Sequence, residues 1–469
     1  MAKKTVQITS PYHNWETLLE PITPLADRIA QGKRLRAHCA RKDHKNWQAP
    51  GHRTNPLELL RSQHEDRLEN LLPLRYHRMS ASPLAFLRGS SIVMAADLAH
   101  TPNSSIPVQL CGDCHLSNFG GFATPERNII FELNDFDETH PGPWEWDIKR
   151  LAVSFIVAAL DNGFSMATAE NCVYELAKSY RFHMQRFSQM SALDVWYHRL
   201  DVNVLASRLE KNGRREGLLA KLKDWKRTRT HEGAFDKLTE VVDGKRRIKD
   251  NYPLITHAEG VTHESIREVL IKYFNRLTQY RRQLLLRYRF VDVAMKVVGI
   301  GRVGTKCGIV LLQGEGGGQD PLFLQIKQAN RSVLEPFTAK SEYDHHGERV
   351  VAGQRLLQAA SDLFLGWTTG HRGFHFYVRQ LMDVKGALPV DELDAVTLAQ
   401  YAQMCARALA RAHARSGDSA VITGYLGTSE AFDEALCTFA QTYAKQNEHD
   451  YNMLLRAIKK GSIAASPQL

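Results

Sequence analysis

The sequence lacks the patterns that define several common protein classes. It contains no run of about 18 uninterrupted apolar residues, so we expect no membrane-spanning helix and no membrane partner. The N-terminal stretch MAKKTVQITS leads into no apolar segment of the kind that a secretory signal requires. We therefore expect a cytoplasmic protein.

Motifs of the large hydrolase classes are absent as well. No G-x-S-x-G elbow occurs, and neither 345-HH-346 nor 448-EHD-450 has the H-E-x-x-H spacing of zinc proteases. The sequence also contains no zinc-finger pattern, no aromatic RNA-recognition motif and no internal repeat. Hydrolase chemistry and a repeat architecture therefore have no support.

Positive charge, by contrast, is in excess. Lys and Arg number 61 against 51 Asp and Glu, which gives a formal net charge of +10 over 469 residues. This balance favours anionic partners, such as a nucleotide, a phosphorylated substrate or a nucleic acid. The charge does not exclude nucleic acid, but the densest basic run, 33-KRLRAHCARKDHK-45, is more typical of a solvated helix face.

The stretch 109-QLCGDCHLSNFGGF-122 has two interpretations. Cys111, Cys114 and His115 form C-x-x-C-H, which is typical of haem attachment, a redox dithiol or half of a zinc site. The seven cysteines are scattered, however, and no second C-x-x-C completes a four-cysteine zinc site. In the other interpretation the motif is G-D-x-H-x-x-N, and Asp113 and Asn118 carry the chemistry.

The expected elements divide the chain into four parts of an α+β fold. Residues 290–329 have the pattern of a three-stranded antiparallel meander with glycine turns, followed by a helix over 348–363 and a strand over 374–381. The other parts show mainly helical spacing of apolar residues. The four parts are a basic helical extension (1–80), a helical region that carries the functional loops (81–285), a glycine-loop sheet (286–385) and C-terminal helices (386–469).

The first turn of the meander contains G-x-G-x-x-G, formed by Gly299, Gly301 and Gly304. In dinucleotide-binding folds this pattern opens a helix, whereas in protein kinases it joins two strands and covers the nucleotide phosphates. The following residues 305–312 are typical of a strand, so we favour the kinase-type arrangement. The alternative is a flexible hairpin tip without a ligand.

Lys327 lies among apolar residues on the expected third strand of the meander. Burial of an unpaired ammonium group is costly, so a phosphate partner would explain it. In protein kinases a lysine on the third strand holds phosphates and pairs with a glutamate of the next helix. Glu348 is the candidate for that glutamate and Glu335 the other option, while a solvated lysine at the sheet edge is the alternative.

Two polar motifs follow one another in the helical region. Asp113 and Asn118 have the spacing of the kinase catalytic loop, in which the aspartate accepts the proton of the substrate hydroxyl and the asparagine binds magnesium. The expected strand 129-IIFEL-133 then leads to Asp135, which is suited to bind magnesium, and to Asp137, a possible second ligand. A surface acidic turn is the alternative for this second motif.

G-D-x-H-x-x-N followed by N-D-F-D resembles the catalytic core of aminoglycoside and choline phosphotransferases, in the protein-kinase-like superfamily. The whole chain also resembles an uncharacterised bacterial family of unknown function placed with those kinases. The shared phrases are 86-FLRG-89, 112-GDCHLSNFG-120, 134-NDFDET-139, 146-WDIKRLA-152, 353-GQRLLQAASDLFLGW-367 and 409-LARAHARSGD-418.

The resemblance implies a two-lobed fold, with a small antiparallel-sheet lobe and a large helical lobe, and ATP and magnesium as cofactors. It implies that Asp113 is the catalytic base and that Lys327 holds phosphates under the glycine loop. Asn118 and Asp135 would be metal ligands, and His115 and Asp147 would support the catalytic loop.

The chain departs from the kinase pattern in three respects. The glycine loop and Lys327 follow the catalytic loop instead of preceding it, which predicts a circular permutation that brings 409–418 next to the catalytic loop. Cys111 stands where related phosphotransferases carry histidine. The short spacing from Asp137 to Asp147 leaves no room for a long peptide-positioning segment, which favours a small-molecule acceptor.

We therefore expect an ATP- and magnesium-dependent phosphotransferase that acts on a hydroxyl group of a small molecule. A nucleotidyl transferase on the same fold and a non-catalytic, nucleotide-binding pseudokinase are alternatives. A thiol-redox protein that uses Cys111 and Cys114 is a further one.

Overall fold

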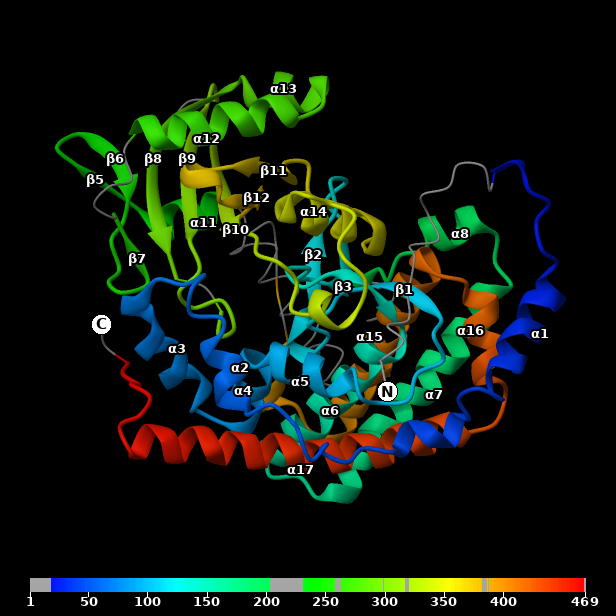
Figure 1. The fold of residues 1–469 in the computed structure, drawn as a ribbon. Helices are drawn as coiled ribbons and strands as arrows, with labels where there is room; N and C mark the ends of the chain where they lie inside the picture. The colour runs from blue at the N-terminus through cyan, green and yellow to red at the C-terminus, as the bar shows by residue number, and fades with distance from the viewer. Residues whose placement is uncertain are drawn as a thin grey trace.

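The computed structural model describes residues 18–202, 231–257, 263–297, 299–316, 320–381, 386 and 388–467. They form an α+β fold in which a six-stranded antiparallel sheet lies beside a larger assembly of helices (Figure 1). The longest helix, α17 (Ala431–Lys459), lies at the edge of the molecule opposite the sheet. Among the described residues, no helix combines the length and the apolar character needed to cross a membrane.

The six strands of the sheet lie in the order β11-β12-β10-β9-β8-β7, and every neighbouring pair is antiparallel. The expected meander is confirmed as β8, β9 and β10, and the strand expected over 374–381 is confirmed as β12. The bounds are β7 (Ile255–Thr256), β8 (Tyr288–Lys296), β9 (Cys307–Gly314), β10 (Pro321–Gln328), β11 (Gly366–Thr369) and β12 (His375–Gln380).

The two faces of the sheet are covered differently. Ile326 and its cross-strand partner Val378 pack in an apolar cluster with Val269 and Tyr273 of α12 (His263–Arg276). Because side chains alternate along a strand, Lys327 points to the opposite face. This face is turned toward the helical assembly, where Lys327 meets the carboxylate of Asp137.

Residues 190–285 differ from the mainly helical stretch that was expected. Of these, 203–230 lie outside the described residues. The remainder includes strands as well as helices. Apolar side chains of α12 and α13 pack against the six-stranded sheet, most of whose strands follow these helices in the sequence. The elements are α8 (Ala192–Tyr197), α11 (His231–Leu238), β5 (Thr239–Val242), β6 (Lys245–Ile248), α12 and α13 (Gln279–Leu285).

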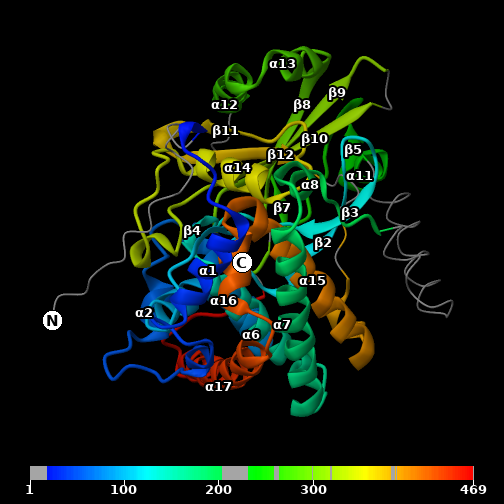
Figure 2. The same ribbon diagram turned by 90° about the vertical axis from the view of Figure 1, so that its right-hand side faces the viewer.

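The helical assembly is centred on α6 (Glu145–Asp161), which packs against α7 (Met166–Ser188) and α17. Helix α6 is buried on nearly all sides because the stretch 151-LAVSFIVAA-159 is apolar around its whole circumference. Figure 2 shows α15 (Ala395–Ser416) side by side with α7.

Short elements join these helices to the functional loops. β3 (Ile129–Leu133) confirms the expected strand, and β1 (Pro107–Leu110) leads into the catalytic-type loop. Each pairs with a strand that was not foreseen. The remaining elements are α1 (Leu25–Leu35), α2 (Pro56–Arg61), α3 (Leu72–Met79), α4 (Pro83–Gly89), α5 (Ser91–Leu98), β2 (Phe119–Ala123), β4 (His140–Pro143), α14 (His346–Leu357) and α16 (Ser419–Leu426).

The first described helices wrap around the C-terminal ones. Helix α1 crosses α16 so closely that a Cβ atom at Gly32 would lie 1.9 Å from the carbonyl oxygen of Val421. Helices α2 and α4 both contact α17. The N-terminal region therefore packs as part of the helical assembly.

A buried ion pair joins β3 to α15. The carboxylate of Glu132 and the guanidinium group of Arg411 lie 2.6 Å apart, and neither side chain is exposed. Glu132→Ala would leave the Arg411 guanidinium buried without its carboxylate, which typically costs about 3–5 kcal/mol. We expect the free energy of unfolding, measured by urea denaturation, to fall by about this amount.

The matched control is Glu126→Ala. Glu126 pairs with Arg199 at 3.5 Å, but the two side chains are 64% and 44% exposed. A surface pair of this kind contributes about 0–1 kcal/mol. Equal losses of stability in the two variants would contradict the importance of the buried pair.

Candidate functional site

The catalytic-type loop after β1 is held by a carboxylate of α6. Asp147, in the first turn of that helix, accepts the backbone N–H groups of Cys111 at 2.8 Å and Gly112 at 3.1 Å. The Nε2 atom of His413, on α15, lies 3.3 Å from the same carboxylate. The loop is therefore anchored by two helices, α6, which precedes the sheet in the sequence, and α15, which follows it.

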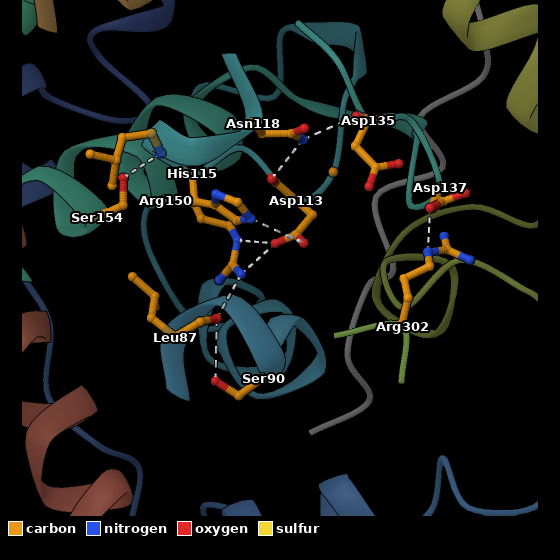
Figure 3. A network of polar contacts seen from close by, with 12 residues as sticks. Leu87, Ser90, Asp113, His115, Asn118, Asp135, Asp137, Arg150, Ser154 and Arg302 are labelled. Atoms are coloured by element: carbon orange, nitrogen blue, oxygen red, sulfur yellow. Dashed lines mark hydrogen bonds and ion pairs between the residues drawn. The ribbon is translucent and has the colours of Figure 1, made fainter. Parts of the chain in front are cut away.

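Asp113 points into a network of polar side chains (Figure 3). Its Oδ1 atom accepts a hydrogen bond from Nε of Arg150 at 2.7 Å, and Nη2 of Arg150 contacts the same oxygen. The same guanidinium group donates to the backbone oxygen of Leu87 at 2.9 Å. Arg150 thus fixes the orientation of Asp113 and ties it to the end of α4.

His115 lies against the other oxygen of Asp113. Its Nε2 atom is 3.7 Å from Oδ2 of Asp113, which is too long for a hydrogen bond. Burial lowers the pKa of His115 to about 4, so the imidazole is neutral near pH 7. A neutral ring leaves Oδ2 without a competing cation.

Asn118 links the two polar motifs. Its Nδ2 atom donates to the backbone oxygens of Asp113 at 3.2 Å and Asp135 at 3.1 Å. Both amide hydrogens are thereby used, so the amide oxygen is the atom that Asn118 can offer to a ligand. Figure 3 shows the Asp135 side chain between this loop and Asp137, and its carboxylate is 43% exposed.

Lys327, on β10, connects the sheet to the second polar motif, which contains Asp135 and Asp137. Its Nζ atom lies 3.0 Å from Oδ2 of Asp137 and 3.8 Å from Oδ1 of Asp135. The residue is 4% exposed, and burial lowers the pKa of its ammonium group to about 7 against the opposing effect of Asp135. Arg302, on the glycine loop, pairs with the same Asp137 oxygen (Figure 3).

The glycine loop joins β8 to β9, so a strand follows it, as the kinase-type interpretation predicted. Gly299 has a φ angle of +66° and Gly304 one of +93°, a region in which other residues are strained. A Cβ atom at Gly301 would lie 3.0 Å from the backbone oxygen of Arg88. Glycine is therefore favoured at each of the three positions by conformation or by space.

The N-terminal region holds the glycine loop from outside. Arg67 donates to the carbonyl oxygen of Val303 at 2.6 Å, and the N–H of Leu68 donates to that of Gly304 at 2.7 Å. Arg78 donates to the carbonyl oxygen of Gly299 at 2.6 Å. No local pattern in the sequence indicated this support, because the partners are far apart along the chain.

These groups surround a cavity of about 170 Å³. The N-terminal region, the two polar motifs, the glycine loop and residues 330–333 after β10 line it. Of the residues singled out in the sequence, Asp113, His115, Asn118, Asp135, Asp137, Gly299 and Gly301 line the cavity.

Glu348 does not meet Lys327. It lies in the first turn of α14, and in the described part of the chain the carboxylates paired with the Lys327 ammonium group are those of Asp135 and Asp137. Glu335, the other option, is 3.1 Å from Arg331. In this structure the aspartates provide the charge that was expected from a helix glutamate.

Two residues that contact the predicted aspartates were missed. Arg150 and Arg302 both contact the predicted aspartates, and neither was singled out in the sequence. Arg150 lies within the quoted phrase 146-WDIKRLA-152, directly before the apolar part of α6, and its side chain is buried. Arg302 lies inside the G-x-G-x-x-G pattern itself, at a position that the motif leaves open.

The C-x-x-C cysteines lie behind the loop rather than in the cavity. Their Sγ atoms and an oxygen of Asp147 are within 4.8 Å of one another, the one such cluster of potential metal ligands in the described part of the chain. Both thiols are buried, and burial raises the pKa of Cys111 well above its usual value and that of Cys114 to about 11. Protonated, buried thiols suit a packing role better than redox or metal chemistry.

Comparison with known protein families gives one match. The family described as "Uncharacterized protein conserved in bacteria (DUF2252)" matches residues 67–457. The chain belongs to this family. The matched range begins at Arg67 and includes both polar motifs, the glycine loop and Lys327. Searches of curated proteins and of solved structures find no match.

The environment of the two cysteines predicts their reactivity. The thiolate is the nucleophile, so raised pKa values and burial should make both thiols slow to alkylate. We expect iodoacetamide at pH 7.5 to leave Cys111 and Cys114 unmodified in the native protein and to modify them in urea, as measured by peptide mass spectrometry. Fast alkylation of the native protein, or a native disulfide between them, would restore the redox alternative.

Proposed function

We propose that this protein is an ATP- and magnesium-dependent phosphotransferase that acts on a hydroxyl group of a small-molecule acceptor. One observation carries the proposal: Lys327 of the glycine-loop sheet lies 3.8 Å from Asp135 and 3.0 Å from Asp137 of the catalytic-type motifs. The sheet and the polar motifs are far apart in the sequence, yet the glycine loop of the sheet and both aspartates line one cavity. A lysine, a glycine loop and metal-binding aspartates together are the parts of a phosphoryl-transfer site.

The residues present fit a magnesium ion. Oδ1 of Asp137 is buried without a hydrogen-bond partner among the described residues, and Asp135 presents a partly exposed carboxylate. With the amide oxygen of Asn118 they offer hard oxygen ligands, and one or two protein carboxylates are usual for magnesium. The ion would neutralise charge on the transferred phosphoryl group.

The other groups have distinct roles in this proposal. Lys327 and the backbone of the glycine loop would hold the phosphates. Asp113 would accept the proton of the acceptor hydroxyl through Oδ2, because Oδ1 is engaged by Arg150. Arg150 would act as a positioning residue, since it orients Asp113 without facing the nucleotide.

We also propose that the fold is a circularly permuted, protein-kinase-like one with two lobes. The C-terminal end of α15 supports this: Oγ of Ser416 lies 3.2 Å from the backbone nitrogen of Gln109 on β1, which leads into the catalytic-type loop. The order glycine loop, lysine on the third strand, then helix α14 supports the small lobe. Permutation is tolerated where the original ends meet at the surface.

Nucleotide binding requires the glycine loop to move. The cavity of about 170 Å³ is smaller than typical ligand pockets of about 300–1,000 Å³. Arg302 crosses it to reach Asp137. A magnesium ion at Asp137 competes with this ion pair, so we expect Arg302 to leave Asp137 when the nucleotide and the metal bind.

The first test is calorimetric titration with ATP and magnesium. We expect binding by the wild type that is lost in Asp135→Ala and in Lys327→Ala, because each variant removes one side of the same site. Glu126→Ala and Lys340→Ala, at exposed positions, serve as matched charge controls and should bind normally. A folded wild-type protein that binds no ATP would refute the proposal.

A transfer assay then separates the alternatives. Label moved from the γ-phosphate of ATP to an acceptor, with loss of transfer but not of binding in Asp113→Asn, supports phosphoryl transfer. Label moved from the α-phosphate would indicate a nucleotidyl transferase instead. Binding without any transfer across an acceptor screen would favour the pseudokinase alternative.

The protonation of Lys327 predicts that the affinity for magnesium–ATP depends on pH. Its pKa of about 7 means that the amine becomes neutral as the pH rises above 7, whereas a bound phosphate favours the charged form. Binding therefore takes up a proton, and the affinity for magnesium–ATP should fall by up to about tenfold per pH unit above pH 7. Titrations from pH 6.5 to 9 measure this slope.

Lys327→Arg is the control for this dependence. A guanidinium group keeps its proton throughout the range, so the slope should disappear even where the affinity itself is lower. A slope that persists in Lys327→Arg would show that another group titrates.

A further inference from the structure

Arg88 lies between the two loops of the proposed site. It belongs to 86-FLRG-89 at the end of α4, and its side chain lines the cavity beside Asp113. The preceding carbonyl, of Leu87, accepts the hydrogen bond from the same Arg150 that holds Asp113 (Figure 3). Its own carbonyl oxygen abuts Gly301. Arg88 is therefore fixed relative to both the catalytic-type loop and the glycine loop.

The Arg88 guanidinium group is not held in an ion pair by any carboxylate of the described residues. It makes no hydrogen bond or ion pair with any residue that the structure describes, and its Nε atom is buried. Burial lowers the pKa of Arg88, although Asp113 partly offsets this effect. A guanidinium group in such a position is stabilised by any anion that enters the cavity.

Two of the carboxylates that line the cavity are already engaged by other cations. Asp113 is held by Arg150, and Asp137 is held by Lys327 and Arg302. A second guanidinium group, that of Arg67, also lines the cavity and has a buried Nε atom without a partner. Two guanidinium groups of the N-terminal region therefore line the cavity without an ion pair to any described carboxylate.

We propose that Arg88, with Arg67 beside it, binds an anionic group of the acceptor, a carboxylate or a phosphate, and so places the acceptor hydroxyl at Asp113. This inference rests on the proposed function and names the substrate class for it. It also gives 86-FLRG-89 and the N-terminal helices a role in substrate recognition. The planar guanidinium fork is suited to both kinds of anion.

The test measures two ligands on each variant by calorimetry. One is the non-hydrolysable analogue AMP-PNP with magnesium, and the other is inorganic phosphate, titrated both with and without saturating AMP-PNP. We expect the wild type to bind phosphate alongside AMP-PNP. Arg88→Met should weaken phosphate binding by at least about tenfold, the usual effect of losing a charged hydrogen-bonding partner, and change AMP-PNP affinity by less than about threefold.

Two further variants make the result specific. Arg61→Met removes the same charge from an exposed position of α2 and should leave both affinities unchanged. Arg88→Lys keeps the charge but not the fork and should fall between wild type and Arg88→Met. Thermal melting of each variant establishes that it is folded.

Three outcomes would overturn the inference. Equal losses of AMP-PNP and phosphate affinity in Arg88→Met would assign Arg88 to the nucleotide phosphates. Phosphate binding that ignores Arg88→Met, or no phosphate binding by the wild type, would remove the anion site. Failure of the wild type to bind AMP-PNP would refute the proposed function but not the anion site. In that case, phosphate binding measured in the absence of nucleotide and weakened in Arg88→Met would still support the anion site.

Discussion

The arrangement of the whole site depends on the burial of one ammonium group. Lys327 is 4% exposed, and a buried charge is tolerated only when it is paired. Asp137 and Asp135 meet this requirement from the end of β3, so the sheet is held against the helical assembly at that point. The glycine loop, which belongs to the same sheet, is thereby brought over the catalytic-type loop.

Much of the fold followed from local patterns in the sequence. Alternating apolar residues between glycine turns predicted β8, β9 and β10, and helical spacing of apolar residues predicted mainly helical parts on either side, which include α6, α7 and α15. The polar motifs were recognisable because each occurs at a strand end with the spacing that its chemistry requires. That Lys327 and Asp135 would meet was predicted only through the kinase-type interpretation of both motifs, since no local pattern relates them.

The features that were missed depend on contacts between distant segments. The apolar side chains of helices α12 and α13 do not reveal from sequence which surface they pack against. In the structure that surface is one face of the six-stranded sheet, which is built from strands distant in the sequence. Glu348 was chosen by analogy with a helix glutamate, but the carboxylate nearest to Lys327 comes from a loop. Arg150 and Arg302 act through partners that only the tertiary structure identifies.

The anchoring of the catalytic-type loop by both halves of the chain has a consequence for biosynthesis. Asp113 and Arg150, which donates a hydrogen bond to it, are synthesised in the first third of the chain. The glycine loop and then His413 leave the ribosome much later. Domains usually fold as units in the order of their synthesis, whereas contacts between distant segments delay completion. A nascent chain of this protein therefore carries an unfinished site until nearly all of it has been translated, so a product truncated before His413 lacks one of the groups that anchor the catalytic-type loop.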